Sequence, residues 1–303
     1  MKYSVFHVEG GIGKNIVATN IVRNIKKTYP DRELIVVSPY PEVFLHNPNI
    51  YRIFKMGNCP YFYEDYIKDK DVLVFKHEPY NSHDVITRKK NLARAWCKSL
   101  DLEYDFNKPE FYANQIEEQN AMLLKQTYSN DKPMIAVQIN GGLGAVPRHV
   151  NFNWFRDLPP RYIQPIINKH KDKFNFVQIK ANHQIQLENC TQIDLTLREM
   201  FLLLSQCHSA LTIDSVTQHC MAAFQKPSVV CWVGNSPIVY GYPLHTNIAS
   251  NFKFEKGNVE SYLDPYPLQT QGHQCPLNYD VNNLFDGKII EEEFEKIIKT
   301  DKV

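Results

Sequence analysis

Long apolar runs are missing from this sequence of 303 residues. A membrane-spanning helix needs about 18 or more consecutive apolar residues, and no stretch comes near that length. The apolar run at the amino terminus is also too short for a signal peptide, so residues 1–8 are interpreted as a first β-strand. These absences argue against a membrane-spanning or secreted protein, and we expect a cytoplasmic one.

An excess of charge of either sign is missing too. The formal net charge is +1, which gives no global attraction to nucleic acid or to an anionic membrane. The seven cysteines include no Cys-x-x-Cys pair, and their odd number favours reduced thiols. Adjacent residues such as Cys207–His208 and His219–Cys220 point apart on a strand or helix, so we expect no zinc site. The hydrophobic content of 43% is sufficient for two domains of ordinary size.

A complete P-loop is also absent. The first strand is followed by the glycine turn 9–14, Glu-Gly-Gly-Ile-Gly-Lys. A P-loop would have glycine in place of Val8 and serine or threonine in place of Asn15, and the G-x-G-x-x-G dinucleotide pattern fails as well. We therefore reject an ATPase. The glycines instead allow the backbone to approach a ligand or a neighbouring loop closely.

The most informative segment is 210–234, which is predicted to form strand, turn, helix and strand. Its two apolar runs, 211–213 and 228–233, are continuous, as in buried parallel strands. Asp214 and Ser215 are residue types that cap a helix, and Pro227 prevents its continuation. The amino terminus of such a helix presents backbone N–H groups to an anion at the strand ends. His219 lies one turn into the helix, on the face that carries Ser215.

This segment resembles glycosyltransferase family 9, the heptosyltransferase-like enzymes of the GT-B fold. The family pattern is roughly D-S/T-G-P-M-H-L-A-A-A-L-G-x-P-V-V-x-L-F-G. The chain matches it without a gap at Asp214, Ser215, His219, Ala222, Ala223, Pro227, Val229, Val230 and Gly234. The family's Gly-Pro-Met is replaced by Val-Thr-Gln at 216–218. The amino terminus also resembles the family, at Gly10, Gly11, Ile12, Gly13, Tyr29, Pro30 and Asp31. The alternative is a generic strand–helix–strand packing unit with a surface histidine.

The resemblance implies an α/β fold of GT-B type, with two Rossmann-like domains facing a central cleft. We expect an acceptor-side domain at 1–130 and a nucleotide-sugar-binding domain at 131–284. A carboxy-terminal helix is expected within 285–303, where it could cross back to the first domain. Apolar periodicity predicts helices at 15–29, 87–100, 115–128, 154–170 (broken near Pro159) and 289–298.

The resemblance also implies a function, the transfer of a sugar from a nucleotide-diphosphate sugar to an acceptor with inversion. No metal and no further cofactor are expected. The implied donor-binding residues are Gly11, Gly13, Arg148, Asp214, Ser215 and His219. Arg148 is matched, with a gap, to a family lysine that contacts the donor phosphates. The helix terminus and a nearby cation would stabilise the negative charge that develops on the leaving diphosphate.

The catalytic base is where chain and family differ, because Lys14 replaces the aspartate presumed to be the family's base. We predict that Glu9 takes over as the base, with Lys14 orienting it or binding an anion. The polar loop 77–84 and the helix after it are expected to face the acceptor, through His77, His83 and Arg88. A basic stripe on that helix, formed by Lys90, Arg94 and Lys98, is interpreted as a solvated face.

The acceptor is less well defined than the donor. By resemblance it is a glycan of lipopolysaccharide type, while the departures from the family leave another glycan or a modified nucleic-acid base open. Two alternatives to a transferase remain. One is a sugar epimerase of GT-B fold, and the other is a catalytically silent nucleotide-sugar-binding protein, since Lys14 stands where the base should be.

Overall fold

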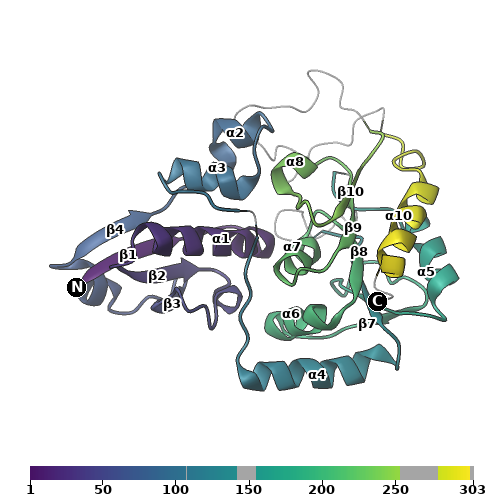
Figure 1. Cartoon of the computed structure of the whole chain (residues 1–303), viewed down its shortest axis with the longest axis horizontal. Coiled ribbons are helices and arrows are strands. Elements are labelled where there is room, and N and C mark those ends of the chain that lie inside the picture. Colours follow the sequence, from purple (N-terminus) through teal and green to yellow (C-terminus); the bar gives the residue numbers. More distant parts are fainter. Residues whose placement is uncertain (107, 142–154, 253–278, 301–303) are drawn as a thin grey trace. The chain divides into compact units, whose positions relative to one another are not determined.

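The chain consists of two compact α/β units. The computed structural model describes residues 1–106, 108–141, 155–252 and 279–300 (Figure 1). The units comprise Met1–Glu117 and Glu118–Val303. The expected boundary near residue 130 lies at the end of helix α4 (Gln115–Ser129), whereas the units divide near its start.

The first unit, unit 1, is built on a parallel sheet with the strand order β3-β2-β1-β4. The strands are β1 (Lys2–His7), β2 (Glu33–Ser38), β3 (Arg52–Lys55) and β4 (Asp71–Phe75). The helices are α1 (Ile12–Thr28), α2 (His83–Ile86) and α3 (Leu92–Ser99), with short helical turns η1 (Pro41–Val43), η2 (Tyr63–Ile67) and η3 (Pro79–Asn81). Because all four strands are parallel, the loops that follow them leave the same edge of the sheet.

The glycine turn before α1 is held by a side chain rather than by a capping bond. Gly11 occupies the N-cap position. The Asn15 amide donates to the carbonyl oxygens of Gly10 (3.2 Å) and Gly11 (2.9 Å) and accepts from the Ser38 hydroxyl (2.7 Å). Asn15, at the position of the P-loop serine or threonine, therefore fastens the turn to the end of β2.

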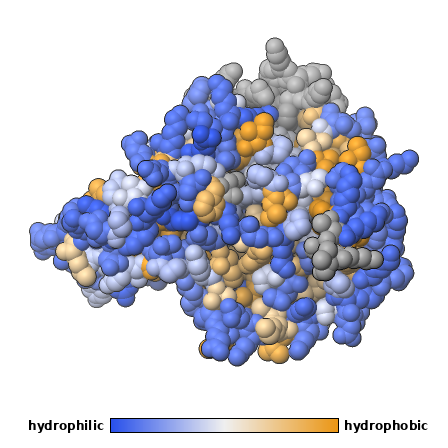
Figure 2. All heavy atoms as spheres, viewed as in Figure 1, coloured by the Kyte–Doolittle hydropathy of each residue, from blue (hydrophilic) through white to orange (hydrophobic). Residues whose placement is uncertain are grey.

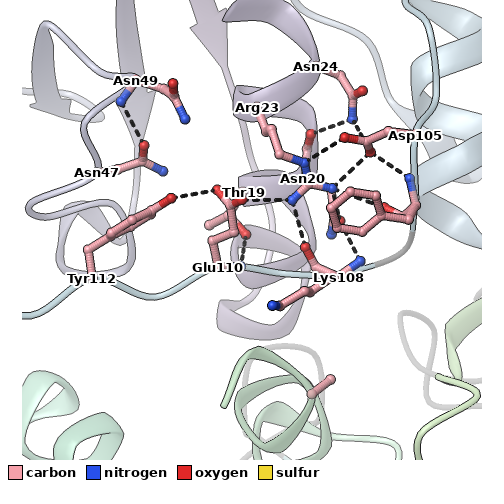
Figure 3. Close-up of polar contacts among 12 residues, drawn as sticks. Thr19, Asn20, Arg23, Asn24, Asn47, Asn49, Asp105, Lys108, Glu110 and Tyr112 are labelled. Atoms are coloured by element: carbon pink, nitrogen blue, oxygen red, sulfur yellow. Dashed lines mark hydrogen bonds and ion pairs between the residues drawn. The ribbon is translucent and has the colours of Figure 1, made fainter. Parts of the chain in front are cut away.

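A buried polar face of α1 binds the segment that leads out of unit 1 (Figure 3). The Arg23 guanidinium donates to both carboxylate oxygens of Asp105 (2.8 and 2.9 Å) and to Glu110 (2.9 Å). Asn20 accepts from the Lys108 backbone N–H (2.9 Å). A planar, always charged guanidinium suits this paired recognition, which anchors Asp105 and Glu110 to α1.

The second unit, unit 2, contains a six-stranded parallel sheet with the order β10-β9-β8-β5-β6-β7. The strands are β5 (Met134–Val137), β6 (Asn175–Gln178), β7 (Cys190–Gln192), β8 (Ser209–Ile213), β9 (Ser228–Trp232) and β10 (Thr246–Ala249). The helices are α5 (Gln164–His170), α6 (Leu197–Gln206), α7 (Val216–Ala223), α8 (Pro237–Tyr240) and α10 (Gly287–Thr300), with the turn η4 (Pro160–Tyr162). β5, β8 and β9 are buried along their whole length, as their continuous apolar runs predict.

The carboxy-terminal helix packs on its own unit. α10 contacts β8 and β9, and its apolar residues Ile290, Phe294 and Ile297 belong to the core of unit 2. The predicted helix at 289–298 is thus confirmed. The expectation that it could cross back to the first domain stays a prediction.

Two predicted helices are shorter than expected. The helix predicted at 87–100 begins only at Leu92, because the Asn91 side chain accepts from the Arg94 backbone N–H (2.8 Å) and caps it. In the range 154–170, of which residue 154 lies outside the described residues, the prolines leave only η4 and α5. After residue 234 the chain forms the helix α8 and the strand β10.

The surface carries no continuous apolar band on the face drawn in Figure 2, where hydrophobic residues lie in small groups among hydrophilic ones. Within the described ranges, no helix combines the length and the apolar character needed to cross a membrane.

Candidate functional site

The segment that resembles family 9 forms the turn from β8 into α7 in unit 2 (Figure 1). Ser215 is the N-cap residue, as predicted, but its side chain makes no capping hydrogen bond. The backbone N–H of Thr217, in the first turn of α7, donates instead to the side chain of Gln138 (3.2 Å). Gln138 follows β5, the neighbour of β8. One amide of the predicted anion site is therefore already bonded to the protein.

Asp214 is buried and held on several sides rather than acting as a cap. Its carboxylate accepts from the side chains of Asn235 and Gln218 and lies 3.9 Å from the Arg156 guanidinium. Burial raises the pKa of Asp214, while Arg156, Asn235 and Gln218 act in the opposite direction. The favourable contacts thus only partly offset the cost of burying this carboxylate.

His219 lies in the same cluster as a buried, uncharged imidazole. Its Nδ1 is 2.8 Å from the Tyr242 hydroxyl, and the two rings meet edge to face. Burial, with smaller contributions from His245 and Arg156, lowers the pKa of His219 to about 3. His245, which donates to the carbonyl oxygen of Gln218 (2.9 Å), has its pKa lowered to about 4, also by burial. At neutral pH both histidines serve as hydrogen-bonding groups and not as cations.

The cation of this cluster is Arg156, which the sequence did not single out. Its guanidinium lies 3.9 Å from the Asp214 carboxylate, and its side chain is only 21% exposed. The next residue, Asp157, is buried and accepts from the Asn140 side chain (3.0 Å) and the Gly141 backbone N–H (2.7 Å). These bonds fix the segment that carries Arg156 against the loop after β5. Arg148, the predicted phosphate ligand, lies outside the described residues.

The glycine turn of unit 1 contains a different arrangement, an ion pair between a buried lysine and a partly exposed glutamate. The Lys14 ammonium lies 2.5 Å from a carboxylate oxygen of Glu78, and the Lys14 side chain is only 4% exposed. The ammonium also lies over the rings of Tyr80 (5.0 Å) and Trp96 (5.4 Å). The carboxylate that pairs with Lys14 is thus Glu78 and not Glu9, contrary to our expectation that Lys14 orients Glu9.

The other residues predicted in unit 1 lie nearer to solvent. The Glu9 side chain is 53% exposed, 3.4 Å from the Lys76 ammonium and 3.5 Å from His7. Gly11 and Gly13 lie at the start of α1. His77, His83 and Arg88 are all exposed around α2. Their predicted contacts with the donor and the acceptor stay predictions.

The basic stripe after this loop is an intramolecular ion-pair surface. Lys90 and Lys98 lie 3.1 and 2.9 Å from the buried carboxylate of Asp84. Hydrogen bonds from these two lysines lower the pKa of Asp84. Two of the three cations of the stripe thus share one carboxylate within the protein, and the interpretation of the stripe as a solvated face stays a prediction.

Metal ligands do not gather anywhere in the parts of the chain that the structure describes, since no group of three or more histidine, cysteine, aspartate or glutamate side chains is arranged to hold an ion. The described cysteines are unpaired thiols. Burial raises the pKa of Cys97, for example, to about 12.

The two residues that sequence reasoning missed, Glu78 and Arg156, differ in how they could have been found. A buried lysine at position 14 requires a carboxylate partner, and Glu78 follows β4, a neighbour of β1. That adjacency depends on the strand order, which the local sequence does not reveal. Arg156 lies far from Asp214 in the sequence, so only the tertiary structure brings the two together.

Comparison with known proteins gives a result at the level of structure only. No protein-family model and no curated protein sequence matches the chain. The fold, by contrast, matches solved glycosyltransferases. A family 9 glycosyl transferase from Veillonella parvula superposes with a TM-score of 0.69 at 13% identity, over 99% of this chain and 98% of that one.

Two proteins of E. coli give similar results. The ADP-heptose lipopolysaccharide heptosyltransferase II has a TM-score of 0.67 at 13% identity, with 100% of both chains covered. Heptosyltransferase WaaC with ADP has a TM-score of 0.54 at 11% identity, over 82% of this chain and 93% of that one. The fold is of GT-B type. The predicted fold class, with two Rossmann-like α/β units, is thereby confirmed, and the GT-B likeness extends over nearly the whole chain rather than over a single unit.

Proposed function

We propose that this protein is a glycosyltransferase that moves a sugar from a nucleotide-diphosphate sugar to an acceptor with inversion. The observation that carries the proposal is the GT-B fold over nearly the whole chain, with a polar cluster at the turn where the sequence also resembles family 9. Fold alone does not determine function, so the chemistry of this cluster has to supply the argument.

The cluster offers several groups suited to a diphosphate. Arg156 brings a positive charge, and its fork can bind two phosphate oxygens at once. The start of α7 adds backbone N–H groups and the positive end of the helix dipole. His219 adds a neutral hydrogen-bonding group. Charge that develops on a leaving diphosphate would be stabilised here by the protein itself, so we propose a metal-independent reaction.

The proposed substrates follow from the structural neighbours. One is an ADP-heptose lipopolysaccharide heptosyltransferase, and another was solved with ADP. We therefore propose a nucleotide-diphosphate sugar, in the first instance an ADP-sugar, as donor. The proposed acceptor is a glycan of lipopolysaccharide type, and the proposed location is the cytoplasm.

Binding of nucleotides tests the proposal. ADP, UDP and GDP, with ADP-heptose, ADP-glucose, UDP-glucose, UDP-N-acetylglucosamine and GDP-mannose, form the donor panel for thermal-shift and calorimetric titration. At least one member should bind, and Arg156→Gln should weaken its binding by roughly 1.5–3 kcal/mol, the scale of a lost charge-assisted hydrogen bond. Arg161→Gln is the matched control, since Arg161 is an exposed arginine five residues away. No binding, or equal losses in both variants, would refute the proposed donor site.

His219 provides an independent variant of the same site. His219→Ala should weaken binding of the nucleotide by roughly 1–3 kcal/mol, whereas the exposed His183→Ala should leave it unchanged. Unaltered affinity in a folded His219→Ala protein would exclude the histidine from the donor site.

A second candidate function is supported by one observation. Lys14 occupies the position of the family's presumed base and is already neutralised by Glu78. A protein that binds a nucleotide sugar without turnover would fit this arrangement. It would pass the binding tests above but would release no nucleoside diphosphate from any donor with any acceptor.

A further inference from the structure

Glu78 lies beside the glycine turn of unit 1. β4 and β1 are parallel neighbours with Phe75 opposite Phe6, so Glu78 and the glycine turn leave the same edge of the sheet. Glu78 reaches back across this edge to the ammonium of Lys14, in the first turn of α1.

The Glu78 carboxylate is both fixed and accessible. One oxygen lies 2.5 Å from the Lys14 ammonium, and the other accepts from the Tyr80 backbone N–H (3.3 Å). The Glu78 side chain is nevertheless 41% exposed, whereas Lys14 beneath it is 4% exposed. Two hydrogen bonds thus hold the carboxylate from the protein side, while its other side faces solvent.

Gly10 allows Lys14 to lie in this position. Its φ of +93° is a conformation that side chains disfavour, and a Cβ here would come within 3.0 Å of the Lys14 side chain. The turn, the lysine and the glutamate therefore fit together as one arrangement. Glu9 contrasts with it, because that carboxylate is 53% exposed and its lysine partner, Lys76, is 62% exposed.

We propose that Glu78 is the catalytic base of this protein and that Lys14 positions it. The proposal rests on the proposed transferase function. In the transfer, the acceptor hydroxyl gives its proton to the Glu78 carboxylate while its oxygen forms the bond to the anomeric carbon. The bond from that carbon to the diphosphate breaks, and its electron pair leaves with the nucleoside diphosphate. Glu78 later returns the proton to solvent.

The family has its presumed catalytic aspartate at position 14, whereas this chain has a lysine there and a carboxylate at Glu78. Two variants can therefore test whether a carboxylate at this place is required. Glu78→Gln keeps the shape of the side chain and removes its basicity. The double variant Lys14→Asp/Glu78→Gln then places a carboxylate on α1, at the position of the family's aspartate. If a carboxylate at this place is what the reaction requires, the second variant should recover part of what the first one loses.

The experiment measures release of nucleoside diphosphate from the donor panel, with deacylated lipopolysaccharide core, a mixture of oligosaccharides, or water as acceptor. Glu78→Gln should lower the rate at saturating donor by about 100-fold or more, the usual scale for a general base, with donor affinity within about threefold of wild type, since less than 1 kcal/mol of binding is at stake. Lys14→Asp/Glu78→Gln should regain about tenfold. Glu103→Gln, which alters a glutamate that is 79% exposed, should match the wild type. Melting temperatures establish that each variant is folded.

Other results would overturn either the role of Glu78 or the proposed function. Wild-type-like turnover by Glu78→Gln, or a larger loss in Glu9→Gln than in Glu78→Gln, would overturn the proposal. So would a wild-type protein that binds a donor and releases nothing from it, because the pair would then have no catalytic role. Failure of the wild type to bind any donor would instead reject the proposed function itself, and that result appears in the titration rather than in the rate.

Discussion

The two units handle buried polar groups differently at equivalent places. Each has a turn from a parallel strand into a helix. Unit 1 places the close pair of Lys14 and Glu78 there, whereas unit 2 combines neutral imidazoles with the Asp214 carboxylate, 3.9 Å from the Arg156 guanidinium. A buried charge requires a close partner, while a neutral imidazole requires only hydrogen bonds. The turn of unit 2, which matches the family pattern at His219, holds that histidine uncharged. The turn of unit 1 departs from the pattern at Lys14, and Glu78 compensates the charge of that lysine.

The largest expected difference between the two units is in the stability that each loses as the pH falls. The folded-state pKa values of His219 and His245, about 3 and about 4, lie below the unfolded value near 6.5. Below pH 6.5 the unfolded chain therefore binds protons that the folded chain does not, and unit 2 loses stability as the pH falls. The loss is about 1.4 kcal/mol per pH unit for each histidine, or roughly 2 kcal/mol each at pH 5. The raised pKa of Asp214 acts in the opposite direction, because its protonation in the folded state returns some stability.

Most of the loss of stability in unit 1 should occur at a lower pH than in unit 2. Burial alone would raise the pKa of Asp105, but hydrogen bonds from Arg23 and the Phe106 backbone hold it below its ordinary value. Its contribution is present above the unfolded pKa near 3.9 and is lost as the pH falls further. Burial also lowers the pKa of His7, a partly exposed histidine of unit 1, in the same direction as the pKa values of the two histidines of unit 2. Hydrogen exchange at pH 7 and pH 5, read from peptides of each unit, measures the difference, and equal losses of protection would contradict it.

Removal of Arg23 should have the next largest effect, this time in unit 1. Arg23→Ala leaves Asp105 and Glu110 without their cation, and the partners are only 16% and 17% exposed. We expect a loss of about 3 kcal/mol of unfolding free energy, the usual cost of breaking a buried pair. Faster hydrogen exchange should be confined to 105–112 and α1. Arg32→Ala, whose partner Asp71 is 55% exposed, is the control and should cost less than about 1 kcal/mol.

A smaller effect should distinguish one glycine of each unit, Gly11 in unit 1 and Gly234 in unit 2. A Cβ at Gly234, after β9, would overlap the ring of Phe155, whereas a Cβ at Gly11 would meet nothing within 4 Å. Gly234→Ala should therefore destabilise unit 2 by about 1–3 kcal/mol through overpacking, while Gly11→Ala should stay within about 0.5 kcal/mol of wild type. Urea denaturation measures both. Equal stability of the two variants would show that Phe155 moves aside without cost.

Features that depend on residues close together in the sequence could be predicted, whereas features that depend on distant residues could not. The β8–α7–β9 unit was predictable because its apolar runs, cap and proline are local signals. The start of α3 was predicted too early, because the Asn91 side chain caps the helix only there. The neutral state of His219 depends mainly on its burial, with smaller contributions from His245 and Arg156, and only the tertiary structure shows these. Glu78 and Arg156 were missed for the same reason, since their partners Lys14 and Asp214 are distant in the sequence.

Product analysis tests the central claim, sugar transfer without a metal, most directly. The protein is incubated with the donor that it binds and with glycan acceptors in the presence of EDTA, and the new linkage is read by NMR. We predict a glycosidic bond whose anomeric configuration is inverted relative to the donor, formed at a rate that added magnesium or manganese does not change. A retained configuration, transfer that appears only when a divalent metal is restored, or a bound donor that is never transferred would contradict it.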